Sequence, residues 1–164
     1  MRPRLTYLGL IAASVALAIP AGGHEPTAPT ARASALEPVT SAPAAVVDAF
    51  HAALANGDLA GAKALLAEDA LIYESGGVER GKAEYASHHL PADAAFTAAT
   101  MRSVTRRTGQ AAGSMAWIAT EATATGSFKD RAVDSVSIET MVLRREQGAW
   151  RIAHIHWSSA NSKK

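Results

Sequence analysis

The chain closes with Trp150-Arg151-Ile152-Ala153-His154-Ile155-His156-Trp157-Ser158-Ser159, a run with the alternating character of a β-strand. Side chains of a strand point alternately to its two faces, so His154 and His156 share one face and Trp157 lies on the other. This strand therefore delivers either two imidazoles or a large indole into the interior. Which of the two it delivers decides what kind of site the fold can hold.

Three more strand-like runs precede this one, and turn signals separate all four. The runs cover residues 96–107, 111–125, 132–145 and 149–159. The turn signals are Thr108-Gly109-Gln110, Gly126 to Arg131 and Glu146-Gln147-Gly148. Long strands joined by short turns predict an antiparallel meander.

The residues that precede the predicted meander show the apolar spacing of helices. Apolar residues at spacings of three and four predict a helix over 46–54, and Asp58 is expected to cap a second helix. A short strand is expected at 71–73, and a third helix over 82–89 that ends before Pro91. Helices followed by a meander predict an α+β domain in which the helices pack on one face of the sheet.

The first part of the chain reads as a targeting segment rather than as structure. Residues 1–23 combine a positive start at Arg2 and Arg4 with an uncharged apolar stretch, which predicts a signal peptide. The apolar stretch is shorter than the ~20 residues that a membrane-spanning helix needs. Residues 24–42 are rich in Pro, Ala, Thr and Ser and predict a flexible linker, which places the folded domain at 43–160.

Charge and cysteine content exclude several classes of protein. The chain has 16 basic and 15 acidic residues, and loss of Arg2 and Arg4 would leave 14 basic ones. This balance gives no electrostatic case for nucleic acid, or for a membrane once the signal is cleaved. The absence of cysteine excludes disulfides and a cysteine nucleophile, and suits a bacterial periplasmic or secreted protein.

Three motifs carry a family resemblance. The first two are Asn56-Gly57-Asp58-Leu59 and Leu71-Ile72-Tyr73-Glu74. The third is the closing part of the chain, in the segments 139–145, 148–152 and 154–156. Over 44–159 the chain resembles the nuclear transport factor 2-like superfamily, which includes ketosteroid isomerases and SnoaL-like cyclases. Its closing part is similar to the association domain of calcium/calmodulin-dependent protein kinase II.

The resemblance implies a cone-shaped α+β fold, with three N-terminal helices packed on a curved antiparallel sheet around a ligand pocket. It also implies a homodimer formed through the outer sheet face. The superfamily contains isomerases, cyclases, dehydratases and non-catalytic binders, so the fold alone does not assign an activity. No cofactor is predicted.

The turn before the last strand decides which residues enter the cone. A three-residue loop at 146–148 would pair Arg145 with Ala149 and bring Met141 and Trp157 inside, which agrees with the kinase-like resemblance. A two-residue turn at Gln147-Gly148 would reverse the parity and bring both histidines inside. The first register is preferred.

The same reasoning predicts a pair of glutamates. Centring the preceding loop near Asp130 pairs Glu121 with Glu139 inside the concavity. Two close carboxyl groups in a partly dry site would give a general acid beside a general base. Glu121, Glu139 and, as a hydrogen-bond donor, Tyr73 are therefore the catalytic candidates. The alternative is that both glutamates lie at a solvated rim, or that Arg102 or Arg151 neutralises them.

The expected ligand is small and apolar or weakly polar. The residues expected to line the pocket are Tyr73, His88, Trp117, Ala119, Met141, Ile155 and Trp157. An anionic ligand is disfavoured, because Ala119, Met141 and Trp157 occupy positions where the kinase-like branch has pocket arginines. A metal site is not favoured, since no recognised ligand spacing occurs, and its only candidates are His154 and His156 with His88.

Three functions remain open at this point. The first is an exported protein that binds a small apolar ligand in a conical pocket. The second is an isomerase, dehydratase or cyclase that uses a pocket glutamate as general base. The third is a metal-binding periplasmic protein. Whether the protein is an enzyme is left undecided by the sequence.

Overall fold

The computed structural model describes residues 42–162. The predicted signal peptide and residues 24–41 of the predicted linker lie outside this part. The helices of the described part are α1 (Ala42–Ala55), α2 (Leu59–Ala64), α3 (Lys82–His88) and α4 (Leu90–Ala99). Its strands are β1 (Leu66–Glu74), β2 (Gly77–Arg80), β3 (Thr100–Ala112), β4 (Met115–Phe128), β5 (Arg131–Glu146) and β6 (Ala149–Asn161).

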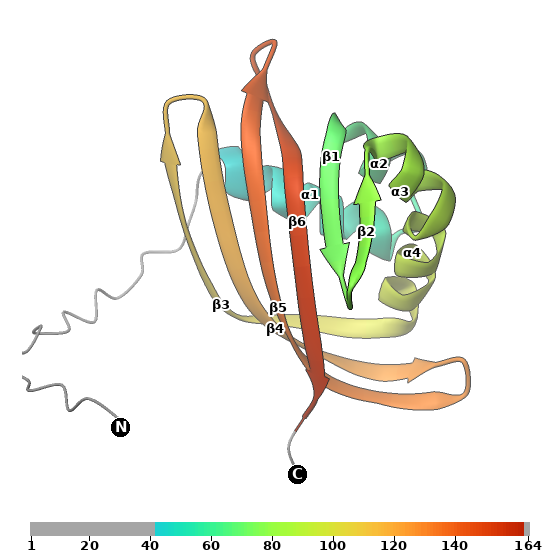
Figure 1. Ribbon diagram of the computed structural model, residues 1–164. Coiled ribbons are helices and arrows are strands. Elements are labelled where there is room, and N and C mark those ends of the chain that lie inside the picture. Colours follow the sequence, from blue (N-terminus) through green and yellow to red (C-terminus); the bar gives the residue numbers. More distant parts are fainter. Residues whose placement is uncertain (1–41, 163–164) are drawn as a thin grey trace, which may run out of the picture. The chain divides into compact units, whose positions relative to one another are not determined.

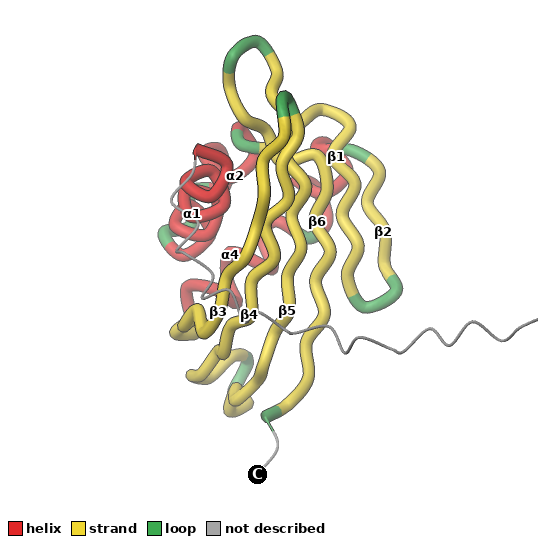
Figure 2. Tube along the Cα trace, turned by 90° about the vertical axis from the view of Figure 1, so that its left-hand side faces the viewer, coloured by secondary structure: helices red, strands yellow, loops and turns green. Residues whose placement is uncertain are grey.

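The strands form one curved sheet in the order β2-β1-β6-β5-β4-β3, and the helices lie on one side of it (Figures 1 and 2). The predicted α+β class and curved sheet are confirmed. Every neighbouring pair is antiparallel except β1 and β6, which run parallel. None of the helices in residues 42–162 is long and apolar enough to cross a membrane.

The helical part contains four helices rather than the three predicted. Pro91 was expected to end the third helix, and it instead occupies the first turn of α4. Proline is well tolerated there, because the first backbone N–H groups of a helix have no partner within the helix. Residues 96–99, predicted as strand, consequently belong to α4.

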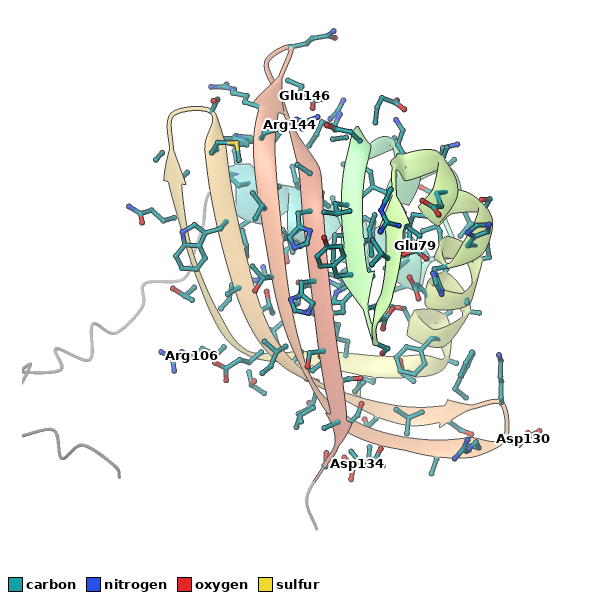
Figure 3. All side chains as sticks on the ribbon, in the orientation of Figure 1. Glu79, Arg106, Asp130, Asp134, Arg144 and Glu146 are labelled. Carbon is teal, nitrogen blue, oxygen red and sulfur yellow. The ribbon has the colours of Figure 1, made fainter. Side chains whose placement is uncertain are left out.

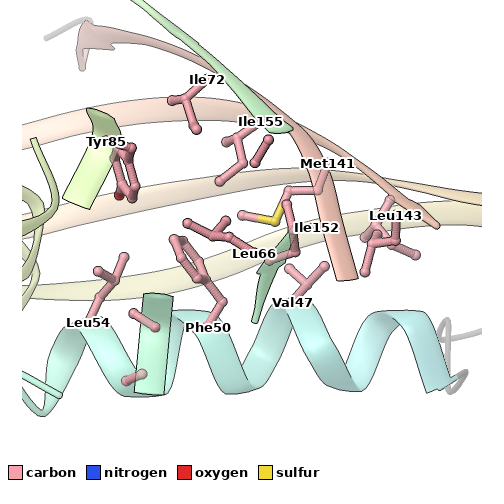
Figure 4. Packing of buried hydrophobic residues seen from close by; sticks show 14 of the residues in the cluster. Val47, Phe50, Leu54, Leu66, Ile72, Tyr85, Met141, Leu143, Ile152 and Ile155 are labelled. Carbon is pink, nitrogen blue, oxygen red and sulfur yellow. The ribbon is translucent and has the colours of Figure 1, made fainter. Parts of the chain in front are cut away.

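The hydrophobic core lies between α1 and the concave face of the sheet (Figure 4). Val47 and Phe50 of α1 are fully buried, as are Met141 and Ile155 of the sheet. Full burial of such side chains contributes about 1.5–3 kcal/mol each. The predicted helix face is therefore the face that holds α1 on the sheet.

The turn between β5 and β6 differs from the preferred prediction, yet the strand faces agree with it. The turn has two residues, Gln147 and Gly148, both with positive φ, as in the common short hairpin turns. The predicted pairing of Arg145 with Ala149 is therefore wrong, because Glu146 faces Ala149. Without a further irregularity in β6, this two-residue turn would place the side chains of His154 and His156 on the inner face of the sheet.

A β-bulge reverses that outcome. Leu143 faces Ile152 and Val142 faces His154, so Ala153 is an extra residue on β6. A bulge of this kind shifts all later side chains to the opposite face. Glu139 consequently faces Trp157, with the indole inside and both histidines outside.

The predicted pairing of Glu121 with Glu139 is wrong by one residue. The β4–β5 turn consists of Lys129 and Asp130, so Glu121 faces Ile138 and Glu139 faces Thr120. A shift of one residue moves a side chain to the other face of the sheet. Glu121 is exposed, 4.0 Å from the guanidinium Nε of Arg106, which projects beside β3 (Figure 3).

The predicted turn at 108–110 lies inside β3. Gly109 pairs with Ile118, and a Cβ added there would lie 2.6 Å from both Ile118 Cδ1 and the Trp117 carbonyl oxygen. The glycine therefore allows close approach of β3 to β4. The chain reverses instead after Ala112, at Gly113.

Candidate functional site

A cavity of about 360 Å³ lies between α1, α4 and the concave face of the sheet. The residues that line it come from both layers of the domain. They are His51, Leu54, Glu74, Ala92, Asp93, Phe96, Thr97, Thr100, Arg102, Ala124, Phe128, Ser135, Ser137, Glu139, Trp157, Ser158 and Ser159. The volume of the cavity lies in the range of pockets that hold small organic ligands.

A row of paired residues crosses the sheet at the cavity. Glu74 of β1 faces Trp157 of β6, and Trp157 faces Glu139 of β5. All three line the cavity, so two carboxyl groups flank one indole. The bulge at Ala153 is what places Trp157 in this row.

Glu139 is the centre of a buried polar network. The residue is 2% exposed. Its Oε2 accepts hydrogen bonds from the indole Nε1 of Trp157 at 2.8 Å and from His51 Nε2 at 2.6 Å. Arg102 Nη2 lies 3.7 Å from the other oxygen, Oε1, which has no hydrogen-bond partner.

This network keeps Glu139 ionised. Burial opposes the charge, but the hydrogen bonds from His51 and Trp157, with the charges of His51 and Arg102, outweigh it and hold the pKa below its usual range. Glu139 is therefore an acceptor and an orienting group, not a proton donor. Sequence reasoning considered Arg102 only as a neutralising partner of the glutamates, and it also lines the cavity.

His51 is brought to the cavity by α1. It follows Val47 by four residues and precedes Leu54 by three, so it lies at the edge of the buried helix face. Its side chain is 15% exposed. Because a carboxylate only accepts hydrogen bonds, we assign a proton to Nε2; when the ring is neutral, Nδ1 keeps a lone pair. A histidine held in this way is suited to general-base chemistry.

A second carboxyl centre combines Asp93 of α4 with Glu74. The hydroxyl of the buried Tyr85 donates to Asp93 Oδ2 at 2.7 Å. Burial raises the pKa of Asp93. Burial and the charge of Asp93 raise the pKa of Glu74. For the same reasons the pKa of Tyr85 lies well above its usual range, so its hydroxyl remains protonated and can donate.

The structure brings only some of the predicted site residues together. Glu139 and Trp157 line the cavity as predicted. Met141 and Ile155 face the same side of the sheet, but both are fully buried in the core and do not line the cavity. His88, at the end of α3, is exposed and does not line it either.

The remaining predicted residues lie on the outer face of the sheet, and those of β4 do so because its register with β5 differs from the prediction. Trp117, Ala119 and Glu121 alternate with the buried residues of β4. Tyr73 is 39% exposed and packs against the rings of His154 and His156, at centroid distances of 5.2 and 6.3 Å. Glu121 and Tyr73, predicted as catalytic, therefore do not line the cavity.

The side chains of His154 and His156 of β6 lie on the outer face of the sheet. His154 Nδ1 lies 2.7 Å from the Leu71 carbonyl oxygen, to which it donates. Within residues 42–162 no three His, Cys, Asp or Glu side chains are grouped so that they could hold a metal ion. His88 therefore does not complete a site with His154 and His156.

Comparisons with known proteins agree with this fold. A SnoaL-like domain profile matches residues 44–162. A candidate ketosteroid isomerase from Shewanella frigidimarina is 38% identical, with a TM-score of 0.70 over 73% of this chain and 96% of that one. No protein of curated function matches.

More distant structures share the fold alone. A candidate calcium/calmodulin-dependent protein kinase II association domain from Xanthomonas campestris is 22% identical, covering 73% and 86% of the two chains at a TM-score of 0.63. A candidate NTF2-like dehydratase from Streptomyces avermitilis is 18% identical, covering 73% and 94%, also at 0.63. The predicted nuclear transport factor 2-like fold is confirmed.

Proposed function

Since the chain belongs to the SnoaL-like domain family, we propose that it is an enzyme that transfers a proton on a small, largely apolar molecule, as an isomerase or a dehydratase does. The observation that carries this proposal is the hydrogen bond between His51 and Glu139 inside the cavity. The sequence alone offered no complete catalytic set, and the helix-borne histidine supplies the missing base.

In the proposed reaction His51 Nδ1 removes a proton from a carbon next to a carbonyl group. The electron pair moves onto the carbonyl oxygen, and the imidazolium so formed is stabilised by the ionised Glu139. Arg102, a half-buried cation that lines the same cavity, is placed to stabilise the negative oxygen. An isomerase would return the proton to a different carbon, and a dehydratase would expel a hydroxyl group.

Two further observations support acid–base chemistry. Phe96, Phe128 and Trp157 give part of the cavity wall an apolar character, and electrostatic interactions are stronger beside a wall of low polarity. The Shewanella relative, at 38% identity, carries the description of a candidate ketosteroid isomerase. Isomerisation of that kind is a proton transfer between carbons.

The experiment uses nitrobenzisoxazole, whose ring opens when a base removes a proton from its carbon. Loss of His51 removes the base, so His51→Ala is expected to reduce the elimination rate by about 10²–10⁴-fold. The matched control is His88→Ala, which removes an exposed histidine outside the cavity lining. Equal rates for the two variants would contradict the proposal.

A second candidate function is non-catalytic binding of a small apolar ligand. It is favoured by the apolar part of the cavity wall, in which the ring of Phe96 contacts that of Phe128 at 5.4 Å between centroids. This candidate predicts that nitrobenzisoxazole binds without elimination. Saturable quenching of tryptophan fluorescence with no product would therefore favour it.

We also propose a homodimer through the outer face of the sheet. Trp117 is 41% and Ile138 is 59% exposed on this face, and burying such side chains favours association. In sedimentation velocity, Ile138→Lys is expected to convert a dimer into a monomer. Ala95→Lys, on an exposed position of α4, serves as the control. A monomeric wild-type protein would contradict the proposal.

We propose, finally, that residues 1–23 direct export to the periplasm or the medium. The expected result is a protein in the periplasmic or culture fraction whose mass lacks the signal peptide. Mass spectrometry of fractionated cells tests this. A full-length mass in the cytosolic fraction would contradict it.

A further inference from the structure

The row of residues that contains Trp157 and Glu139 continues across the sheet as far as β3. Glu139 faces Thr120 of β4, and Thr120 faces Arg107 of β3. Thr120 is 1% exposed, and its Oγ1 accepts a hydrogen bond from Arg107 Nε at 3.3 Å. Arg107 does not line the cavity. The row therefore places a cation two strands away from Glu139, outside the space available to a substrate.

Helix α1 is tied to this row at two points. Asp48 Oδ1 accepts a hydrogen bond from Arg107 Nη1 at 2.6 Å. Glu139 Oε2 accepts one from His51 Nε2, also at 2.6 Å. Asp48 and His51 are three residues apart, which makes them neighbours on the surface of the helix. One turn of α1 is consequently held to β3 on one side and to β5 on the other.

Apolar packing holds α1 on the sheet but does not by itself fix the position of His51. The hydrophobic effect has no direction and depends on the area that is buried. A small rotation of α1 about its axis would leave Val47 and Phe50 covered. The same rotation would break the hydrogen bond from His51 to Glu139, because such bonds weaken steeply outside a narrow range of distance and angle. A second directional contact on the same turn prevents this movement.

The ion pair between Asp48 and Arg107 has the properties of a positioning contact. The side chain of Asp48 is 64% exposed, and an ion pair with so exposed a partner adds little to stability. Arg107 is 15% exposed, and its Nη2 is buried without a hydrogen-bond partner, which costs stability. Because the guanidinium is planar, the bond from Nε to Thr120 also fixes the direction of Nη1. Arg107 is thus a rigid anchor whose presence stability does not explain.

We propose that Arg107 and Asp48 are positioning residues for His51: their ion pair fixes α1 so that His51 Nε2 stays within hydrogen-bond distance of Glu139. Neither residue touches the substrate. The inference rests on the proposed function for its effect on catalysis, whereas the placement of His51 does not depend on that function. A displacement of about 1 Å at a reacting group can cost up to about 10²-fold in rate.

The first test is kinetic and uses Asp48→Ala, which keeps a residue that favours helix in α1. The variant is expected to lower kcat for nitrobenzisoxazole by about tenfold and to leave KM unchanged, because Asp48 does not line the cavity. In a His51→Ala background, Asp48→Ala is expected to have no further effect. A change in KM alone, or an equal loss of rate in the His51→Ala background, would overturn the inference.

The chain offers a matched control in Asp69→Ala. Asp69 of β1 is 69% exposed and forms an ion pair with Arg144, away from α1 and from the cavity. The control therefore breaks an ion pair of similar exposure without releasing the helix, and the rate is expected to stay at the wild-type value. A loss of rate in Asp69→Ala equal to that in Asp48→Ala would overturn the inference.

The second test does not need catalysis and depends on the sign of a change. The hydrogen bond and the charge of His51 help to hold the pKa of Glu139 below its usual range, together with Trp157 and Arg102. If Asp48→Ala releases His51, the pKa of Glu139 rises. Loss of the negative charge of Asp48 alone would lower it. Carbon NMR of the Glu139 carboxyl group along a pH series measures the change, and a fall or no change would overturn the inference.

A conservative variant separates contact from charge. Asp48→Asn removes the charge but retains an oxygen that can accept from Arg107 Nη1, so it is expected to keep most of the elimination rate. A variant as slow as Asp48→Ala would overturn the inference. The outcome is also separable from that of the proposed function. A raised Glu139 pKa in Asp48→Ala, with no elimination by the wild type, would contradict the enzyme and keep the positioning role. Elimination that Asp48→Ala leaves unchanged would do the reverse.

Discussion

The two carboxyl centres of the cavity show opposite electrostatics. Glu139 is almost fully buried and remains ionised, with its pKa below the usual range. Glu74 and Asp93 are less buried, yet their pKa values are raised. The difference lies in the partners, because Glu139 has His51, Trp157 and Arg102 around it. Partners, rather than depth, decide which carboxyl group stays charged.

The largest difference between the two centres is expected in stability. Glu139→Ala leaves His51 and Arg102 without their carboxylate and the Trp157 N–H without an acceptor. Breaking a buried ionic pair in this way costs about 3–5 kcal/mol of unfolding free energy. Glu74→Ala removes a carboxyl group that has no such partners, and is expected to cost less than about 1 kcal/mol. Urea unfolding of both variants measures the two losses of unfolding free energy. Equal losses would contradict the predicted difference between the two centres.

The pH dependence of stability is expected to have opposite signs at the two centres. The pKa of Glu139 is lowered on folding, so its contribution is present above the usual glutamate pKa and is lost as pH falls through the folded value. Glu139→Gln is therefore most destabilising at neutral pH, and its cost decreases in acid.

At the second centre, the pKa values of Glu74 and Asp93 are raised. The ionised pair therefore weakens the folded state at neutral pH, and the penalty disappears as pH falls below the usual carboxyl value of about 4. The double variant Glu74→Gln, Asp93→Asn is expected to be more stable than wild type at neutral pH and equal to it in acid. Urea unfolding along a pH series tests both signs, and the same sign at both centres would contradict this account.

The smallest effect is expected at Glu121, the glutamate once paired with Glu139 in the sequence-based prediction. It is exposed on the outer face, and its contact with Arg106 is long, at 4.0 Å. Exposed ion pairs of this kind contribute little, so Glu121→Ala is expected to change the unfolding free energy by no more than about 0.5 kcal/mol. A loss comparable to that of Glu139→Ala would mean that the β4–β5 register is wrong.

Much of the fold could be predicted from the sequence, because periodicity reports which residues are buried. The face of α1 that carries Val47 and Phe50 followed from helical spacing. The alternating strands 132–145 and 149–159 were predicted within two residues of β5 and β6. What periodicity could not supply was the length of each turn, since Gln147-Gly148 fits both a two-residue turn and a longer loop. The bulge at Ala153 has no signal in the sequence, because alanine fits either face.

The candidate site was predictable only in part. Glu139 and Trp157 could be placed from the closing strands alone. His51 and Asp93 come from helices, and their position depends on how those helices pack on the sheet. A signal for His51 existed, since it lies four residues after Val47 on the edge of the apolar face. The position of Asp93 on a helix could not be predicted, because the alanine-rich α4 lacks an apolar period and its end, from Phe96, has the character of a strand.

The central claim is that His51 and Glu139 act as one unit, and a double-mutant cycle tests it most directly. The elimination rate of nitrobenzisoxazole is measured for wild type, His51→Ala, Glu139→Gln and the double variant. If Glu139 acts through His51, the double variant should be about as slow as His51→Ala alone. Independent losses that multiply in the double variant, or no loss in His51→Ala, would contradict the account.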